Sequence, residues 1–569
     1  MKHNKTLLAA LLPALTISLL SGCNKPKENT PTSRERKPAT EIGDVINSWT
    51  DRIDSEELPL GLANKNATGT IVTDFGNEDK ESILYEVQHL AKKDYIGSDI
   101  AEVPYFTDDD AGNGDIVSLS VYVPNDANIA SLQLEAFTSS MNNSYKSDLL
   151  TIDETNSDTW VRLVATFNTL ETLGAIRLNY TLVDEGYAAS FYVDDINTIL
   201  GEETVKTDYV SNGESLYKEY EDFFKIGTCM PSRLFNNSMI RKIIKENFNS
   251  ITAENEAKPE RVLDQNASKK IAKDEELNEI TDVVISTKAF EKVYDWCEAH
   301  HIGVRHHTFV WFDQTPLWFF KKGYNENNAY VSKEVMLKRM ENFIKKSLEV
   351  VNQRWPGLVY AIDVANEGIR NGQVRTTDNN GANPNNWTET VGKDFVYYAF
   401  KYARQYAAEG QKLYYNDYSY DYDTNSCKFA INTLLKQAIQ EELVDGIGIQ
   451  GHTDSDQNMD AFITNAKAIK KAGLECQITE LDITINGNSS SDYTKQKKAY
   501  NTLITKILKN NQSGQTNVTA LVVWGVVDDA SWKNSQYPLL FTKNYGKKPA
   551  YYAFLEAIEP YKAVEEVEE

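Results

Sequence analysis

Two glutamates that follow buried strand-like segments could do acid–base chemistry together. Residues 360–365 are apolar apart from one Asp and too few for a helix, so they predict a core strand that delivers Asn366 and Glu367 at its end. A second such segment delivers Glu480. Paired carboxylates suit glycoside hydrolysis, in which one protonates the leaving oxygen and the other attacks or activates water. For either glutamate alone, a salt-bridged carboxylate at a strand end would be the favoured interpretation, so the prediction depends on the pair and its surroundings.

The elements that must position these residues alternate between strands and helices. Helical segments include 238–248, 288–301, 394–407, 428–443 and 494–509. This alternation implies parallel strands joined by helical crossovers. The strand candidates are eight: 223–230, 248–256, 303–311, 358–367, 412–419, 445–452, 476–483 and 520–529. Eight such strands predict an α/β fold of the (β/α)8 (TIM) barrel type, with its site at the carboxyl ends of the strands.

Polar side chains end six of these strand candidates. They are Glu254 and Asn255, His307, Asn366 and Glu367, Asn416 and Asp417, Gln450 and His452, and Glu480. Unpaired polar groups are costly to bury, so six strands ending this way predict one mouth that binds a polar ligand. Glu367 and Glu480 lie on the fourth and seventh strands and should face each other across that mouth.

Length and charge set the remaining organisation. A chain of 569 residues is too long for one core, so at least two domains are expected. The net charge of −24 argues against nucleic-acid and anionic membrane ligands. Residues 41–205 contain short alternating segments that predict an all-β sandwich ahead of the barrel at 216–560. Trp160 lies inside one such strand and is interpreted as a core residue, so no sugar contact is predicted in the sandwich.

The first residues have the pattern of a targeting signal. A basic start and a short apolar stretch precede the sequence LSGC, which resembles a bacterial lipoprotein signal (1–23) that is lipidated at Cys23. An ordinary secretory signal that contains a Cys is the alternative. Residues 24–40 predict a flexible tether, and 561–569 form an acidic tail. We therefore expect a lipid-anchored protein of the bacterial cell envelope that faces outward, at the cell surface or outside the cell.

The remaining cysteines and histidines predict no metal site. Cys229, Cys297, Cys427 and Cys476 lack ligand spacing and are expected to be buried free thiols, although a disulfide between two of them stays open. Neither His307 nor His452 has clustered partners at ligand spacing, and no glycine-rich phosphate loop occurs. No metal and no cofactor are therefore expected.

Seven stretches in order carry a resemblance to one family. They read ITAENEAKPE, HHTFVWFDQTP, IDVANEGI, LYYNDYS, DGIGIQGH, ITELDI and WGVVDDASW. Across 216–560 the chain resembles glycoside hydrolase family 10, the retaining endo-β-1,4-xylanases, and 41–205 resembles the jelly-roll carbohydrate-binding modules found beside glycosidases. The resemblance implies an enzyme that cleaves internal bonds of xylan with retention and that binds xylan or a xylo-oligosaccharide. A monomer is expected. The alternatives are a retaining enzyme acting on another β-1,4-glycan or on short xylo-oligosaccharides, and a non-catalytic polysaccharide-binding lipoprotein.

The resemblance also implies roles for individual residues. Glu367 becomes the general acid/base, Glu480 the nucleophile, and Asn366 the partner of the sugar 2-hydroxyl. His452 orients Glu480 and is itself oriented by Asp482, for which a helix cap or a surface acid is the alternative. The remaining predicted substrate contacts are Glu254, Asn255, Lys258, His307, Trp311, Gln314, Asn416, Gln450, Trp524 and Trp532.

The chain departs from the family pattern behind the acid/base. Phe312 stands where the family usually has a histidine, and a phenylalanine cannot donate a hydrogen bond. The network around Glu367, its pKa and hence the pH optimum are therefore left open by the sequence. His306, which precedes His307, is expected to turn away from the mouth into the packing between barrel and helices.

Overall fold

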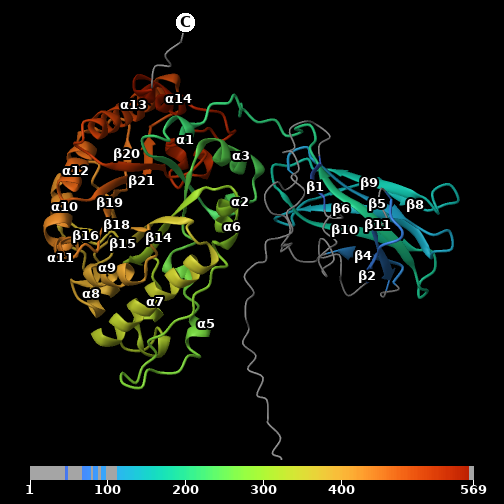
Figure 1. Cartoon of the computed structure of the whole chain (residues 1–569), viewed down its shortest axis with the longest axis horizontal. Coiled ribbons are helices and arrows are strands. Elements are labelled where there is room, and N and C mark those ends of the chain that lie inside the picture. Colours follow the sequence, from blue (N-terminus) through green and yellow to red (C-terminus); the bar gives the residue numbers. More distant parts are fainter. Residues whose placement is uncertain (1–44, 49–66, 78–80, 88–90, 98–111, 563–569) are drawn as a thin grey trace, which may run out of the picture.

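The computed structural model describes residues 45–48, 67–77, 81–87, 91–97 and 112–562. The predicted signal at 1–23, including Cys23, and the tether at 24–40 lie outside the described residues, as does the acidic tail beyond residue 562. Figure 1 shows two bodies beside one another, a β-rich body built from the described residues up to about 200 and a larger barrel wrapped in helices.

The larger body is the predicted (β/α)8 barrel. Its parallel strands are β12 (Lys225–Met230), β13 (Ser250–Ala253), β14 (Gly303–Trp311), β15 (Val359–Asn366), β18 (Lys412–Asp417), β19 (Gly446–Ile449), β21 (Glu475–Thr484) and β22 (Val518–Val523). They pair in this order around the sheet, β22 returns to β12, and β19 pairs directly with β21. Because helices cover the outside of a parallel barrel, most side chains of these strands are buried on both faces, as in β14 and β15. All eight strand predictions are confirmed.

Helices connect the strands on the outside of the barrel (Figure 1). They are α1 (Leu216–Glu219), α2 (Ser232–Phe235), α3 (Ser238–Asn247), α4 (Pro259–Val262), α5 (Gln265–Ser268), α6 (Glu291–Ala299), α7 (Lys333–Arg354), α8 (Asn386–Thr390), α9 (Phe395–Tyr406), α10 (Thr424–Phe429), α11 (Lys436–Gln440), α12 (Asp460–Lys471), α13 (Ser490–Gln512) and α14 (Pro549–Ile558). The predicted helices at 238–248, 288–301, 394–407 and 494–509 are confirmed.

The predicted helix at 428–443 is not continuous. Between α10 and α11 lies a π-helical segment, η5 (Ala430–Leu434), where the Leu435 N–H donates to Ala430 O at 2.8 Å, five residues back. Such a bulge keeps the apolar face of the chain but shifts its phase, which periodicity alone does not reveal.

The smaller body is a sandwich of two antiparallel sheets, as predicted. The first sheet contains β1 (Val45–Ser48), β2 (Ala67–Val72), β3 (Ser82–Val87), β5 (Ile116–Tyr122), β9 (Trp160–Thr166) and β11 (Ser190–Ile199). The second contains β4 (Lys93–Gly97), β6 (Ile129–Thr138), β7 (Ser144–Lys146), β8 (Leu150–Thr151) and β10 (Leu173–Leu182). Buried side chains of both sheets, such as Leu119 and Leu134, form the core between them.

Trp160 does not belong to that core, so its interpretation as a core residue is wrong. Along β9 the buried side chains are Leu163 and Ala165, and alternation turns Trp160 to the opposite face. There its ring stacks on Phe75, with centroids 5.7 Å apart, and lies 5.6 Å from the ring of Tyr122.

The sandwich docks on the connection between β12 and α3. The Ser238 N–H donates to Leu170 O at 2.9 Å and the Thr172 N–H donates to Asn236 O at 2.8 Å, as in an antiparallel bridge. Leu170 also packs against the core of the barrel. Because this connection follows the carboxyl end of β12, the sandwich meets the barrel on the side where the candidate site lies.

Two properties bear on the expected environment. Cys229, Cys297, Cys427 and Cys476 are buried free thiols, which excludes a disulfide among them. None of the helices in the described part of the chain combines the length and the apolar composition that crossing a bilayer requires.

Candidate active site

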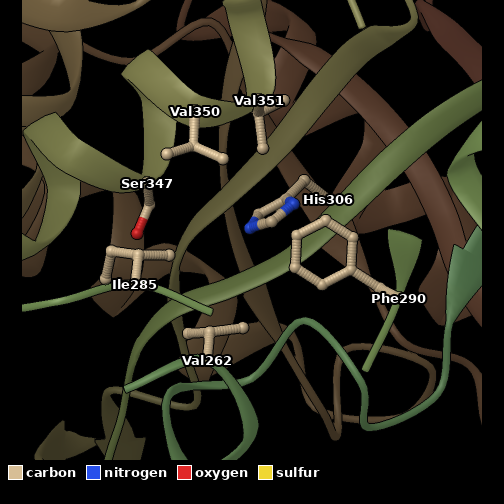
Figure 2. A pocket seen from close by; sticks show the side chains of 7 residues that line it. All are labelled: Val262, Ile285, Phe290, His306, Ser347, Val350 and Val351. Atoms are coloured by element: carbon tan, nitrogen blue, oxygen red, sulfur yellow. The ribbon is translucent and has the colours of Figure 1, made fainter. Parts of the chain in front are cut away.

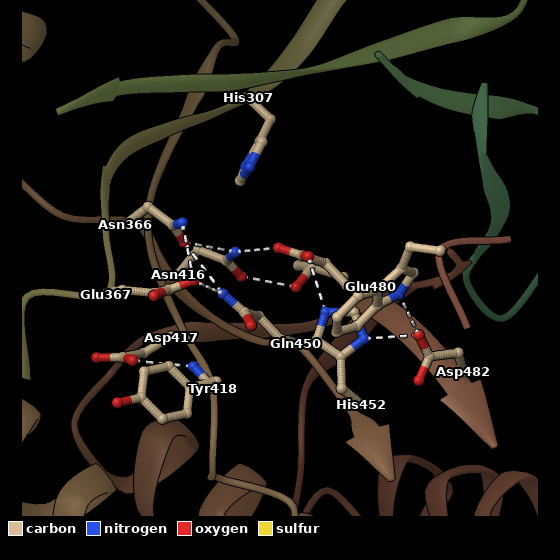
Figure 3. Close-up of polar contacts among 12 residues, drawn as sticks. His307, Asn366, Glu367, Asn416, Asp417, Tyr418, Gln450, His452, Glu480 and Asp482 are labelled. Carbon is tan, nitrogen blue, oxygen red and sulfur yellow. Dashed lines mark hydrogen bonds and ion pairs between the residues drawn. The ribbon is translucent and has the colours of Figure 1, made fainter. Parts of the chain in front are cut away.

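Both predicted catalytic carboxylates lie in one network of amides at the mouth of the barrel (Figure 3). The Asn416 Nδ2 donates to Glu480 Oε1 at 2.7 Å and to Asn366 Oδ1 at 3.0 Å. The Gln450 Nε2 donates to Glu367 Oε1 at 3.1 Å and to Asn366 Oδ1 at 3.3 Å. Four strand ends therefore bring their polar side chains together, as the sequence predicts.

The backbone at Glu367 leaves the strand in an unusual conformation. Glu367 has φ of +52°, in the left-handed region that costs a non-glycine residue about 1–2 kcal/mol. Its N–H donates to Asn416 O at 2.9 Å, and its carbonyl accepts from Arg375 Nε at 2.7 Å. These contacts hold the turn that redirects the Glu367 side chain, and strain of this kind is typical of functional sites.

His452 holds Glu480 in its ionised form. Burial alone would raise the pKa of Glu480, but the hydrogen bond from His452 and the charges of His307, His452 and Lys258 lower it to about 2. Burial would likewise lower the pKa of His452, yet the charge and hydrogen bond of Asp482 and the contact with Glu480 raise it to about 10. The imidazolium therefore donates from Nε2 to Glu480 Oε2 at 3.2 Å and from Nδ1 to Asp482 Oδ2 at 2.8 Å.

Glu367 has the opposite shift. Burial raises its pKa, and the charge of Glu480 raises it further, against the lowering effects of Gln450, Arg375 and Trp311. Two neighbouring carboxyls whose pKa values move apart are suited to separate roles, one as an acid and one as a nucleophile. The arrangement can thus supply a proton from Glu367 and an ionised oxygen from Glu480.

Asp482 is neither a helix cap nor a surface acid, so both alternatives are wrong. The side chain is fully buried in β21. Besides His452 it accepts from Trp532 Nε1 and from Lys533 Nζ, each at 2.9 Å. Three donors thus fix its two oxygens beneath the imidazole ring.

Replacing Asp482 by Asn is expected to raise the pKa of Glu480 by about 1 to 3 units. Loss of the Asp482 charge lowers the pKa of His452, and a neutral imidazole no longer holds Glu480 ionised. The shift would be read by carbon NMR titration of the Glu480 carboxyl in ligand-free protein. Asp529→Asn, on the exposed loop next to this network, is the matched control and should leave the titration unchanged. A Glu480 pKa that stays at about 2 in Asp482→Asn would contradict this coupling.

His307 is positioned by a carboxylate that the sequence analysis did not single out. Its Nδ1 lies 2.9 Å from Asp363 Oδ2, and Asp363 is also paired with the buried Arg305 inside the barrel. Figure 3 shows the His307 ring pointing toward the amide network. Asp363 is the lone charged residue in a buried strand. This isolated charge could have identified it from the sequence as a functional residue.

The other predicted substrate contacts gather on the β13 and β22 sides of the mouth. Lys258 Nζ donates to Asn255 Oδ1 at 2.9 Å and lies 4.6 Å from the centroid of the Trp311 ring. Glu254 pairs with Arg233 at 3.8 Å. Two further indoles complete this side: the Trp524 ring lies 5.9 Å from the His307 ring, whereas Trp532 is 58% exposed and packs its edge on His452.

The Gln314 side chain makes no hydrogen bond to the amide network among the described residues. Its backbone has φ of +46°, and its Oε1 is buried without a hydrogen-bond partner among the described residues.

His306 turns away from the mouth, as expected. Its Nδ1 lies 2.9 Å from the Tyr294 hydroxyl, and burial lowers its pKa to about 4. Figure 2 shows it lining a cavity of about 10 Å³ between the barrel and α7, too small for a ligand larger than water.

A larger polar cavity lies beyond the carboxyl end of β18 and is also lined by Ile369, two residues after Glu367. It has a volume of about 140 Å³, and its walls include Asn371, Asp417, Tyr418, Ser419, Tyr422 and Asp423. Among the described residues, this cavity included, no group of three or more His, Cys, Asp or Glu side chains has the arrangement of a metal site.

Known proteins with this sequence pattern and fold have been described. Residues 215–557, more than half of the chain, match the family described as Glycosyl hydrolase family 10. The bifunctional endo-1,4-beta-xylanase XylA of Ruminococcus flavefaciens is 39% identical over 345 residues, which are 60% of this chain and 34% of that protein. Endo-1,4-beta-xylanase B of Butyrivibrio fibrisolvens is 34% identical over 349 residues, 60% of this chain and 53% of that protein. The chain thus spans between about a third and about half of these relatives.

A solved structure extends the likeness into the sandwich. The N-terminal CBM22-1 and GH10 modules of endo-1,4-beta-D-xylanase 10B from Clostridium thermocellum, in complex with xylohexaose, match 88% of this chain and 95% of that one, with a TM-score of 0.59 and 28% identity. The sandwich therefore resembles a carbohydrate-binding module. The amide network at the mouth lies within the matched segment, and the chain belongs to glycosyl hydrolase family 10.

Proposed function

We propose that the chain is an endo-1,4-β-xylanase that hydrolyses internal bonds of xylan with retention of the anomeric configuration. One observation carries the proposal: Glu367 and Glu480 are linked through Asn366, Asn416 and Gln450, and their pKa values are displaced in opposite directions. The resemblance assigns the acid/base role and the nucleophile role to these same two glutamates. The catalytic roles below are part of the proposal.

The first displacement forms a glycosyl-enzyme. The ionised Glu480 oxygen attacks the anomeric carbon, the bond from that carbon to the leaving oxygen breaks, and Glu367 gives its proton to the leaving oxygen. Asn366 is placed to bind the 2-hydroxyl, a contact that strengthens as the ring gains positive charge. Retention requires carboxyl groups about 5–5.5 Å apart, against about 6.5–9.5 Å for inversion.

The second displacement reverses these roles. Esterification removes the charge of Glu480, which had raised the pKa of Glu367. Glu367 has also lost its proton, so it can accept one from water as that water attacks the anomeric carbon and the ester bond breaks. Two inversions at one carbon leave the product with the configuration of the substrate.

The two sides of the mouth suit the two ends of a sugar chain. As the resemblance implies, we assign the sugars toward the non-reducing end to the side of Lys258, Asn255, Glu254 and the indoles, and the leaving group to the opposite side. Hydroxyl groups of a pentose can exchange hydrogen bonds with such walls, and sugar faces can stack on tryptophan rings.

The substrate proposal is tested on a panel of xylan, arabinoxylan, mixed-linkage glucan and short xylo-oligosaccharides. Xylan and arabinoxylan should give the highest kcat/KM, and proton NMR of the first products should show the β-anomer before mutarotation. A highest rate on glucan or on the shortest oligosaccharides would overturn the substrate assignment, and an α-anomer would overturn retention.

We also propose that the protein is anchored to the outside of the bacterial envelope through a lipid on Cys23. The sequence LSGC after a short apolar stretch supports this. Mass spectrometry of the mature N-terminus tests it, since an unmodified Cys23 would contradict the anchor.

A further inference from the structure

Arg375 lies directly behind Glu367 and is fully buried. Its Nε donates to the carbonyl of Glu367 at 2.7 Å, and its Nη2 lies 3.9 Å from Glu367 Oε2. The same guanidinium donates to Ile369 O at 3.2 Å and to Asn379 Oδ1 at 3.0 Å. One side chain therefore touches both the left-handed backbone and the carboxyl group of the proposed acid/base.

Phe312 supports this guanidinium. The Arg375 Cζ lies 4.0 Å from the centroid of the Phe312 ring, and its Nη2 donates to the Tyr418 hydroxyl at 2.9 Å. A cation over an aromatic face is attracted by the ring quadrupole, more strongly where water is excluded. Phe312 is the position at which the chain departs from the resemblance. The departure therefore replaces a group that could titrate with a ring that holds an arginine.

The charge of Arg375 is significant because few other cations face Glu367. From β21 and β18 the neighbouring acids are Glu480 and Asp417, and burial raises the pKa of Asp417 well above its usual range. Gln450 and Trp311 are neutral. Lys258 acts on Glu367 from the other side of the mouth, and burial lowers the pKa of that lysine. Arginine stays protonated at any working pH, so its charge is the constant one.

We propose that Arg375, stacked on Phe312 and bonded to Tyr418, is a positioning residue for Glu367: it fixes the strained backbone and keeps a permanent positive charge against Oε2. This inference rests on the proposed acid/base role of Glu367. Its consequence is that the acid/base is tuned by a group that does not titrate with it. Burial and the charge of Glu480 raise the pKa of Glu367, and the charge of Arg375 reduces that rise. Glu367 therefore loses its proton at a lower pH than it would without Arg375.

The test compares Arg375→Met with Arg370→Met. Arg370 lies on β16 (Ile369–Arg370) and bonds Thr377 Oγ1 and Asn379 O without contacting Glu367, which makes it a matched control. In Arg375→Met the alkaline limb of kcat/KM should move up by about 1 pH unit or more. The rate on xylan should fall about 10- to 100-fold, whereas a dinitrophenyl xylobioside, whose leaving group needs no proton, should change less than about 3-fold.

The same variants are titrated by carbon NMR of the Glu367 carboxyl without substrate. This readout separates the two proposals, because it requires no turnover: a wild type that does not cut xylan would refute the function, yet a raised Glu367 pKa in Arg375→Met would still support this inference. An unchanged Glu367 titration, or equal losses on xylan and on the aryl glycoside, would overturn it.

A second variant decides the matter if Arg375→Met does not fold. Phe312→Leu keeps an apolar side chain but removes the ring beneath the guanidinium, so the Glu367 titration should move in the same direction by a smaller amount. Arg375→Lys retains the charge but loses the planar fork. In Arg375→Lys the alkaline limb of kcat/KM should stay close to that of the wild type, while the rate of xylan hydrolysis falls. A Glu367 titration unchanged in Phe312→Leu would then refute the proposal.

Discussion

Glu480→Gln is expected to abolish turnover of xylan and of activated aryl xylobiosides alike. The neutral amide cannot attack the anomeric carbon, so no glycosyl-enzyme forms, and an activated leaving group does not remove that requirement. The loss in kcat should be on the order of 10⁴-fold or more. Steady-state assays on both substrates, with the burst of dinitrophenolate followed by stopped flow, measure the effect.

Glu475→Gln is the matched control for this variant. It makes the same substitution on the same strand at the opposite end of β21, where Glu475 pairs with Lys412 and accepts from the Tyr414 hydroxyl. Its activity should remain within a few-fold of the wild type. Turnover in Glu480→Gln equal to that of an active wild type would exclude the nucleophile role, whereas a wild type without turnover would favour a non-catalytic, sugar-binding barrel.

The barrel was predictable because short strand-like segments alternate regularly with amphipathic helices along the chain. β14 and β15 are buried on both faces, so segments such as 303–311 and 358–367 stand out from the amphipathic helices around them. The carboxyl ends of parallel strands meet at one edge of the sheet, and for this reason Asn366 and Glu480 were predicted to lie at one mouth of the barrel. Alternation also predicted the strand β9. It did not reveal whether Trp160 faces the core, because both faces of that strand contain apolar side chains.

Residues that act from irregular segments were not predictable in this way. Arg375 comes just after the short hairpin of β16 and β17 (Gln373–Val374), where no period relates it to Glu367. Phe312 was recognised as a departure, yet its stacking on Arg375 depends on how two loops meet in space. The break in the helix at 428–443 is similar, since a π segment changes one hydrogen bond without changing the pattern of apolar residues.

Glu367→Ala is expected to separate substrates by their leaving groups. On xylan, kcat/KM should fall by about 10²- to 10⁴-fold, because the departing sugar oxygen receives no proton. A dinitrophenyl xylobioside needs none, so glycosylation should proceed at close to the rate of the wild type. Deglycosylation should then stall, since no base activates water, and the progress curve should show a burst followed by a slow phase.

Azide distinguishes a missing base from a damaged site. It is a nucleophile that needs no deprotonation, so adding it to Glu367→Ala should restore the slow phase and give a β-xylobiosyl azide, while the wild type should respond little. The alkaline limb of kcat/KM should also disappear from the aryl substrate, because the group that titrates there has been removed.

Glu442→Ala is the control for the effect of placing alanine in a left-handed backbone conformation. Glu442 has φ of +56°, close to the +52° of Glu367, and follows α11 away from the mouth, so it tests the same substitution in the same strained conformation. It should leave activity on both substrates unchanged. Equal losses on xylan and on the aryl glycoside in Glu367→Ala, or no response to azide, would contradict the acid/base role. The opposite directions of the two pKa shifts would then reflect only a buried carboxyl next to an ionised one.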